Sequence, residues 1–206
     1  MVVRQFVNSV FTSNSYVVHD RATAIIIDMG DFEPVKEYID NNNLDVEALF
    51  ITHTHYDHIY GVRKFLPAFP HAPIYTSVFG KEAFGKPNWN FSRYHGDEMA
   101  IESDRIRTLA GGDALNVLNC HKLEALATPG HDKSCLSYRL EHMLFTGDSY
   151  IPGVKVIASF PNSNKADARF WYSKLQAMSP LYDIYPGHGE PQPRIQLTKY
   201  SIDKIM

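Results

Sequence analysis

The chain has 206 residues, of which 44% are hydrophobic and 21% charged, and its formal net charge is −3. These values are typical of an ordinary globular protein with one substantial core, so we expect a single domain over residues 1–206. The acidic balance, with no run of more than two Lys or Arg, gives no support for nucleic-acid or membrane partners. No segment resembles a signal peptide or a membrane span, which makes a cytoplasmic location the default expectation.

The first fifty residues are expected to form strands and one helix. Short apolar stretches predict strands, and the spacing of Val35, Tyr38 and Ile39 predicts a helix that three consecutive asparagines end. The predicted strands are 2–7, 15–18, 24–28 and 48–51, and the predicted helix is 32–42. Asp28, at the end of its strand, is either a carboxylate that supports the next loop or an ordinary turn residue.

The segment 52–61 reads Thr-His-Thr-His-Tyr-Asp-His-Ile-Tyr-Gly, with three imidazoles and one carboxylate in six positions. Residues two apart on extended backbone point to the same side, so His53 and His55 can reach one ion. Asp57 and His58 stand where a helical pattern begins and can reach a second position nearby. Imidazole and carboxylate suit Zn, Fe, Mn or Ni, and the lack of Cys argues against a structural thiolate site. The alternative, a polar turn, is less compatible with four ligand-type residues in so short a segment.

The rest of the chain is expected to be rich in strands. The predicted strands are 73–76, 99–101, 106–109, 114–118, 122–127 and 182–185, with a hairpin of 134–140 and 143–146. The predicted helices are 166–178 and 195–205, and 78–84 is a turn or short helix. Residues 86–97 form a loop rich in aromatics, which is either a lid or substrate wall or folds back onto the body. Cys120 and Cys135 lack a C-x-x-C spacing and are expected to be reduced thiols.

Three later loops repeat one pattern, in which a strand is followed by Gly and then by His131, Asp148 or His188. Glycine lets the backbone turn sharply and come close to an ion, which explains the repeated Gly-His and Gly-Asp pairs. Ordinary strand-end turns are the alternative for each loop alone, but all four loops together favour a metal centre. The candidate ligands are His53, His55, Asp57, His58, His131, Asp148 and His188. No motif includes the other histidines, His19, His71, His95, His121 and His142, and we treat them as non-ligands.

These motifs resemble those of the metallo-β-lactamase fold superfamily. The resemblance rests on Thr-His-x-His-x-Asp-His-x-x-Gly at 52–61, Thr-Pro-Gly-His at 128–131, Phe-Thr-Gly-Asp at 145–148 and Tyr-Pro-Gly-His at 185–188. It implies an α/β fold, a four-layer αββα sandwich of two mixed β-sheets flanked by helices, with metals at one edge of the sheets. It also implies that His53, His55 and His131 hold one metal, that Asp57, His58 and His188 hold a second, and that Asp148 bridges them.

The chemistry of such a ligand set agrees with this implication. Three protein ligands per metal plus a shared carboxylate leave room for a water, and an open position distinguishes a catalytic site from a structural one. Two cations lower the pKa of that water until hydroxide is available near neutral pH. Asp57 both binds metal and can orient the hydroxide. We therefore expect two divalent metal ions as cofactors, Zn first, with Fe or Mn as alternatives.

Within the superfamily the motifs are most similar to those of the glyoxalase II group, which are hydrolases of glutathione thioesters. Asp148 argues against a true β-lactamase, which typically has Cys or Ser there, and His55 argues against the flavodiiron branch, which has Glu. Two departures weaken an expectation of glutathione specificity. Only residues 189–206 follow His188, where glyoxalase II has a C-terminal helical domain, and the loop after Asp148 lacks a Cys-Gly-Lys/Arg-type segment. The expected substrate is a small thioester, lactone or related ester.

Three residues are candidates for contact with a small-molecule substrate. The loop after the bridging carboxylate faces the metals in this fold, so Tyr150 and Lys155 are named there, and Tyr150 can donate to a developing oxyanion or leaving group. Trp89 is named from the aromatic loop. Ordinary packing of the aromatic rings and a solvated Lys are the alternatives.

Other functions of the same fold stay open at this stage. A mononuclear iron persulfide dioxygenase would need only His53, His131 and Asp148. A phosphodiesterase or RNase Z-like nuclease is weakened by the acidic charge and by the lack of an RNA-binding arm. A non-catalytic metal-binding protein is disfavoured because no ligand is missing from the pattern. The metal, the substrate and the oligomeric state are not fixed by the sequence.

Overall fold

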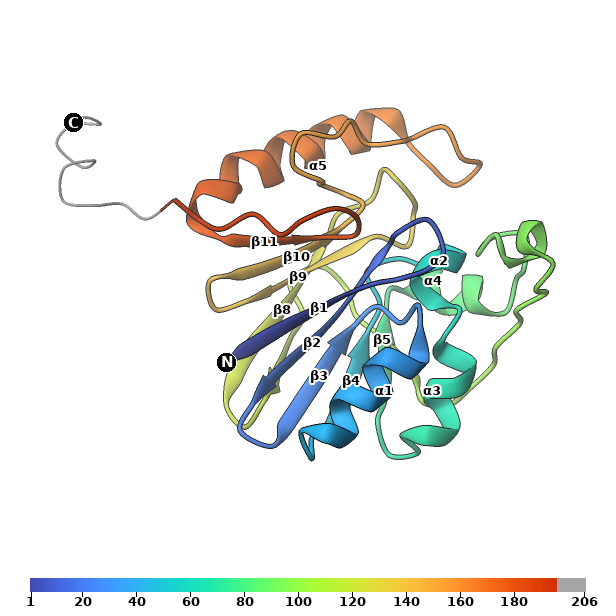
Figure 1. Cartoon of the computed structure of the whole chain (residues 1–206). Coiled ribbons are helices and arrows are strands. Elements are labelled where there is room, and N and C mark those ends of the chain that lie inside the picture. The colour runs from blue at the N-terminus through green and yellow to red at the C-terminus, as the bar shows by residue number, and fades with distance from the viewer. Residues whose placement is uncertain (196–206) are drawn as a thin grey trace, which may run out of the picture.

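The computed structural model describes residues 1–195, which form two β-sheets packed face to face with helices on both outer surfaces (Figure 1). This is the αββα arrangement predicted from the motifs. The helix predicted at 195–205 lies outside the described residues, apart from its first position. Within residues 1–195, no helix has both the length and the apolar character needed to cross a membrane.

The first sheet has the strand order β1-β2-β3-β4-β5-β6. Its strands are β1 (Val2–Val7), β2 (Asn14–Asp20), β3 (Thr23–Ile27), β4 (Asp45–Phe50), β5 (Ile74–Thr76) and β6 (Ile106–Thr108). The first three strands pair antiparallel, and β3 to β6 run parallel. Parallel neighbours need crossover connections, and each of the three here contains at least one helix. The parallel pairing also places the carboxyl ends of β4 and β5 at the same edge of the sheet.

Helices α1 (Phe32–Asn41), α3 (Val62–Ala68) and α4 (Val78–Phe84) belong to the half of the chain that carries the first sheet (Figure 1). Strand β3 shows why both faces of that sheet are apolar. Ile26 belongs to the core cluster that includes helix residues such as Val35, whereas its neighbours Ile25 and Ile27 belong to the cluster between the two sheets. Because side chains alternate along a strand, a continuous run of isoleucines fills two cores at once.

The second sheet has the order β11-β10-β9-β8-β7. Its strands are β7 (Ala114–Val117), β8 (His121–Ala127), β9 (Leu136–Leu140), β10 (Met143–Gly147) and β11 (Asp183–Pro186). Strands β7 to β10 pair antiparallel, and β10 pairs parallel with β11. Helix α5 (Lys165–Met178) covers its outer face, where Leu175 packs with Leu144 and Ile184 (Figure 1). The 3-10 turn η2 (Ser179–Leu181) leads from α5 to β11.

Two predicted elements differ from the structure. Residues 99–101 are not a strand, although Met99 and Ile101 are buried in the first core. The backbone N–H of Met99 donates to the carbonyl of Asp97 in the same loop, and that of Ile101 donates to the carbonyl of Phe84 at the end of α4. The helix expected after His58 is divided into α2 (Tyr56–Ile59) and α3. The division falls at Gly61, where a Cβ atom would lie 2.2 Å from the carbonyl oxygen of Gly30, so only glycine fits this close approach.

Candidate metal centre

Four loops at one edge of the two sheets carry the seven predicted ligands. β4 leads into His53 and His55, the short helix α2 carries Asp57 and His58, and the loops after β8, β10 and β11 carry the other three. The register of the parallel pair β10 and β11 places Gly147 beside Pro186, so the residues that follow emerge side by side. The backbone N–H of Leu136 donates to the carbonyl of Thr52 at 2.7 Å and joins the second sheet to the histidine loop.

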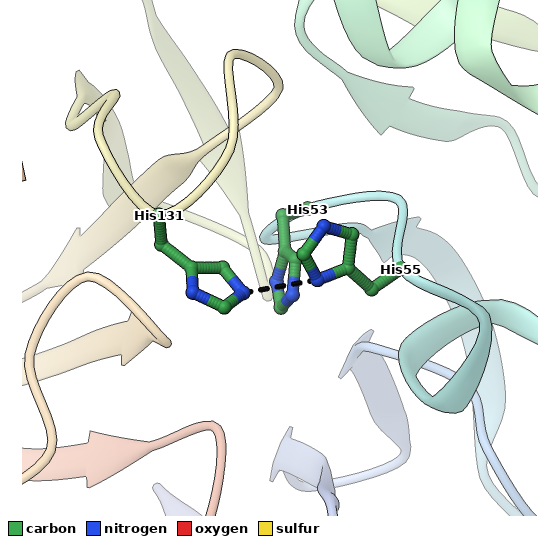
Figure 2. A group of neighbouring side chains, drawn as sticks. All are labelled: His53, His55 and His131. Carbon is green, nitrogen blue, oxygen red and sulfur yellow. Dashed lines mark hydrogen bonds between the residues drawn. The ribbon is translucent and has the colours of Figure 1, made fainter. Parts of the chain in front are cut away.

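His53, His55 and His131 form the first group of converging side chains (Figure 2). All three are buried, and their ring centroids are 4.6 to 5.0 Å apart. The Nε2 atom of His131 lies 2.9 Å from the Nδ1 atom of His55. Two nitrogen lone pairs repel at this distance, so either a proton or a cation must lie between them. The group has the donor set of a three-histidine metal position.

Asp57, His58 and His188 form a second group, and Asp148 lies between the two groups. The Oδ2 atom of Asp57 lies 3.4 Å from Nε2 of His58 and 3.3 Å from Nε2 of His188. The Oδ2 atom of Asp148 is 3.5 Å from Nε2 of His131 and 3.4 Å from Nε2 of His188, so one carboxylate oxygen faces a member of each group. The structure thus brings together all seven residues that the sequence predicted.

Each of the five histidines has a polar neighbour at its other ring nitrogen. These neighbours are Thr52 Oγ1 for His53 (3.2 Å), Asp132 Oδ2 for His55 (3.5 Å), Asp28 Oδ2 for His58 (2.9 Å), the carbonyl of Ile157 for His131 (2.8 Å) and the carbonyl of Phe11 for His188 (3.1 Å). The neighbours within hydrogen-bond distance fix the ring orientation and the tautomer, and leave the facing nitrogen free to bind a metal. Asp132 is the exception, because its Oδ2 atom and the Nε2 atom of His55 form no hydrogen bond. The sequence suggested only Asp28, because the other four depend on contacts between distant segments.

The residues fit a cation chemically. The Nε2 atoms of His53 and His58 and the Oδ1 atom of Asp148 are buried and have no hydrogen-bond partner. Polar atoms buried in this way are costly, and divalent cations bound at the cluster would satisfy them. Gly187 adds a steric observation: a Cβ atom there would lie 2.0 Å from Oδ1 of Asp148 and 3.0 Å from Cε1 of His58. Glycine at this position leaves room for the carboxylate to face the cluster.

In the metal-free site, burial and neighbouring charges shift the pKa values of the proposed ligands. Burial acts to raise the pKa of Asp148, but His188, His131 and His58 hold it well below its usual range. Burial acts to lower the pKa of His58, yet Asp57 and Asp28 raise it to about 9. For His53, burial together with the neighbouring His58 and His55 lowers the pKa. At pH 7 the metal-free site therefore holds ionised carboxylates, a neutral His53 and a protonated His58, which would have to release its proton to bind a metal.

The three predicted substrate residues lie in different surroundings. Tyr150 is only 4% exposed and packs edge-on against Tyr172 in the cluster beneath α5, which favours the packing alternative. Trp89 stacks on Phe79 with centroids 4.9 Å apart, so it folds back onto α4 rather than onto the metal cluster. Lys155 is exposed and lines a cavity beside α5. The substrate contacts named for Tyr150 and Trp89 stay predictions without support from these positions.

Two aromatic residues that the sequence did not single out contact the histidines instead. Phe91, from the aromatic loop 86–97, lies 4.7 Å from the ring of His55, and Phe160 lies 5.3 Å from the same ring and 5.7 Å from His131. Phe91 has a φ of 64°, a left-handed conformation that is uncommon for a bulky residue. The 3-10 helix η1 (Ser92–His95) follows it. Part of the loop thus forms a wall beside the cluster, while Trp89 folds back.

An αββα sandwich with overlapping His and Asp groups at one sheet edge defines a class of metal-site proteins, and the donor set supports the use of divalent metal. The chain belongs to the metallo-beta-lactamase superfamily, because the model of that family matches residues 8–188. Solved structures agree in fold. The B3 metallo-beta-lactamase BLEG-1 superposes with a TM-score of 0.82 at 23% identity over 93% of each chain. TTHA1623, in a di-iron-bound form, gives 0.79 at 21% identity, covering 92% of this chain and 94% of that one.

Two of the curated relatives are hydroxyacylglutathione hydrolases. The chain is 31% identical over 193 residues to a hydroxyacylglutathione hydrolase of Francisella tularensis subsp. novicida (strain U112), covering 91% of this chain and 67% of the relative. It is 27% identical over 186 residues to hydroxyacylglutathione hydrolase 1 of Vibrio vulnificus (strain YJ016), covering 90% and 65%. The chain thus spans about two thirds of the length of these relatives.

Proposed function

We propose that the protein is a dinuclear metal-dependent hydrolase of a small thioester, lactone or related ester, similar to glyoxalase II. The observation that carries this proposal is the position of Asp148, whose carboxylate faces a histidine of each of two groups. A carboxylate shared in this way is suited to holding two cations a short distance apart. The names of the curated relatives support a thioester as the substrate class.

In this proposal, His53, His55 and His131 hold one divalent ion, and Asp57, His58 and His188 hold the other. Asp148 binds both. Zn is the first expectation, with Fe or Mn as alternatives, since imidazole and carboxylate accept all three. When bound, two such ions supply an acidified water as nucleophile and polarise the substrate oxygen. The cytoplasmic location and the lack of nucleic-acid or membrane partners stay predictions, as does the single domain.

The chain's own residues have distinct tasks in such a reaction. Asp57 is ionised, because His58 and His188 lower its pKa by more than burial raises it. Its carboxylate can therefore accept a hydrogen bond from the attacking water and orient it. The rings of Phe91 and Phe160 lie against His55, where they exclude bulk water from one side of the site. Tyr150 has no part in the proposal, because its ring is buried beneath α5.

Metal analysis of the purified protein, together with a substrate panel, tests the proposal. The panel contains a glutathione thioester, a neutral thioester, a lactone, a phosphodiester and a persulfide. We expect about two Zn per chain, as a dinuclear site requires, and turnover of a thioester or lactone. One Fe per chain with oxygen consumption on the persulfide would instead establish the mononuclear dioxygenase alternative. Turnover of the phosphodiester alone would reject the ester class and keep the dinuclear site.

A further inference from the structure

One buried side-chain amide holds the loop that carries His188. Asn14 is the first residue of β2 and is fully buried. Its Nδ2 atom donates to the carbonyl oxygens of Pro186 at 3.0 Å and of Gly189 at 2.8 Å. Its backbone N–H donates to the carbonyl of Gly187 at 2.7 Å. A residue of the first sheet thus binds three of the four carbonyls from Pro186 to Gly189, in the loop that follows β11 of the second sheet.

The donors of Asn14 match these acceptors in number. A side-chain amide has two N–H groups, and two carbonyls accept from it, while its Oδ1 atom accepts from Nε2 of Gln5 at 2.9 Å. The hydroxyl of Tyr16, 3.0 Å from Nδ2, donates to the carbonyl of Pro186 at 2.7 Å and supports the same contact. Such an amide fixes the segment that it binds, because removing one partner leaves buried polar groups without a bond.

The turn before Asn14 holds two ligands of the same group. The carbonyl of Phe11 accepts from Nδ1 of His188 at 3.1 Å, and the hydroxyl of Ser13 donates to the carbonyl of Asp57 at 2.7 Å. Phe11 has a φ of 53°, a left-handed conformation that is strained for a bulky residue and persists only where the surrounding contacts fix it. Two of the three ligands of the second group are therefore supported by one short turn.

The first group of histidines lacks this support. Among residues 1–195, no hydrogen bond joins residues 11–14 to the three histidines of the first group. The polar neighbours of those rings are Thr52, Asp132 and Ile157. The two proposed metal positions are thus supported by different parts of the chain, and a change in one support need not affect the other position.

We propose that Asn14 is a positioning residue for the second metal position, which sets the affinity of that position by holding His188 toward Asp57 and Asp148. The proposal rests on the dinuclear centre of the proposed function and deepens it, because it makes the binding of the two ions separable. The Nε2 atom of His188 lies 3.3 Å from Oδ2 of Asp57 and 3.4 Å from Oδ2 of Asp148. Groups that bind a metal must be held within about 0.5 Å of the productive geometry. A loop released from Asn14 loses this precision.

Stepwise binding of Zn²⁺ to chelator-treated protein tests this role. Asn14→Leu keeps a side chain of similar size and removes both side-chain N–H donors. We expect the second Zn²⁺ to bind at least about tenfold more weakly, as after the loss of a residue that orients a metal ligand, while the first dissociation constant stays at the wild-type value. Asn90→Leu is the matched control, because Asn90 is equally buried and donates to the carbonyls of Ala83 and Met99, in segments without a ligand. It should retain both wild-type constants.

Two background variants identify the ion that is affected. In His188→Gln, which removes a ligand of the second group, Asn14→Leu should leave the remaining Zn²⁺ affinity unchanged. In His131→Gln, which removes a ligand of the first group, Asn14→Leu should weaken the remaining affinity at least about tenfold. A residue that only stabilises the fold would produce the same change in both backgrounds.

Two smaller changes keep the test decisive if Asn14→Leu fails to fold. Ser13→Ala removes the donor to the carbonyl of Asp57, and Tyr16→Phe removes the donor to the carbonyl of Pro186. Each should weaken only the second Zn²⁺, by about fivefold, which corresponds to the loss of one neutral hydrogen bond.

Equal second dissociation constants for wild type and Asn14→Leu would overturn the positioning role, as would a parallel weakening of both constants. Ester hydrolysis by wild type together with equal second constants rejects the role of Asn14 alone. Selective loss of the second Zn²⁺ in the variant, with no ester hydrolysis by wild type, rejects the proposed function alone. A wild-type protein that binds a single Zn²⁺ at saturation rejects both.

Discussion

The Oδ2 atom of Asp28 lies 2.9 Å from the Nδ1 atom of His58, and both residues are buried. The same carboxylate accepts hydrogen bonds from the backbone N–H and the hydroxyl of Thr52, each at 2.7 Å. Asp28 follows β3 with a φ of 57°, a conformation that Asp tolerates better than most residues. A residue 30 positions away from His58 thus fixes the orientation of a proposed metal ligand.

Asp28→Asn should weaken metal binding without unfolding the protein. The amide keeps the shape but loses the charge that holds the His58 ring, and loss of such a partner typically lowers metal affinity about 10- to 100-fold. Competition with a chromophoric chelator measures this affinity. Asp31→Asn is the control, because Asp31 bonds to Ser9 and Tyr60 rather than to a histidine. Equal affinities for wild type and Asp28→Asn would show that the Asp28 contact does not support the metal.

Asp148→Ala should remove most activity and lower the metal content. The proposed bridging carboxylate is lost, so turnover should fall by at least about a hundredfold, which is more than the loss of a hydrogen-bond partner of a metal ligand causes. Elemental analysis and steady-state kinetics are measured on the same preparation. Unchanged turnover would reject the bridging role. Glu33→Ala, which removes an exposed carboxylate paired with Lys64, should leave both quantities unchanged.

Gly187→Ala tests whether the close approach of Gly187 to the carboxylate of Asp148 requires glycine. The new methyl group would lie 2.0 Å from Oδ1 of Asp148 and must displace it, because backbone and His58 close the other sides. We expect lower metal content and at least about a tenfold loss of turnover, comparable with the loss of a residue that orients a metal ligand. Gly85→Ala is the matched control, since its nearest neighbour would be at 3.7 Å, an ordinary contact. If both variants bind metal equally, Gly187 does not control the position of Asp148.

The metal-free protein should lose stability as the pH rises from 7 to about 10. Despite burial, Asp148 and Asp57 raise the pKa of His188 to about 10, and Asp57 and Asp28 raise the pKa of His58 to about 9. In the unfolded chain both groups titrate near about 6.5. Their folded pKa values are higher, so their stabilisation is complete below pH of about 6.5 and is lost as the pH rises through the folded values.

Denaturant unfolding of chelator-treated protein at pH 7, 8, 9 and 10 measures this loss as a falling free energy of unfolding. The pKa values of His53 and His131 are lowered, so these groups titrate below pH 7 and do not contribute in this window. His188→Gln should flatten the pH dependence, because one of the two titrating groups is removed. A profile as steep in this variant as in wild type would contradict the assignment to His188. Metal-loaded protein should show a flatter profile too, since bound imidazoles are already deprotonated.

The sequence by itself indicated the strands and the seven proposed ligands, and the resemblance of the ligand motifs to a known superfamily implied the fold class. Strands and ligands depend on short-range patterns: apolar runs such as Ile25 to Ile27 predict strands, and Gly followed by His or Asp marks the turns after them. Residues 99–101 were predicted wrongly as a strand because they are as apolar as one. Met99 and Ile101 are buried by packing in the first core, while their backbone N–H groups bond within the loop and to the end of α4. No local pattern distinguishes such a segment from a strand.

Tertiary structure decided which residues support and surround the ligands. The carbonyls of Ile157 and Phe11 and the carboxylate of Asp132 reach their histidines from separate loops, and Phe91 rather than Trp89 lies against His55. These contacts join segments that are distant in the chain, so the spacing of the residues in the sequence does not predict them. The ligands can be identified from local sequence, because a strand and the turn after it determine where a side chain points. Ligand orientation depends on the packing of two sheets and α5, which only the folded chain provides.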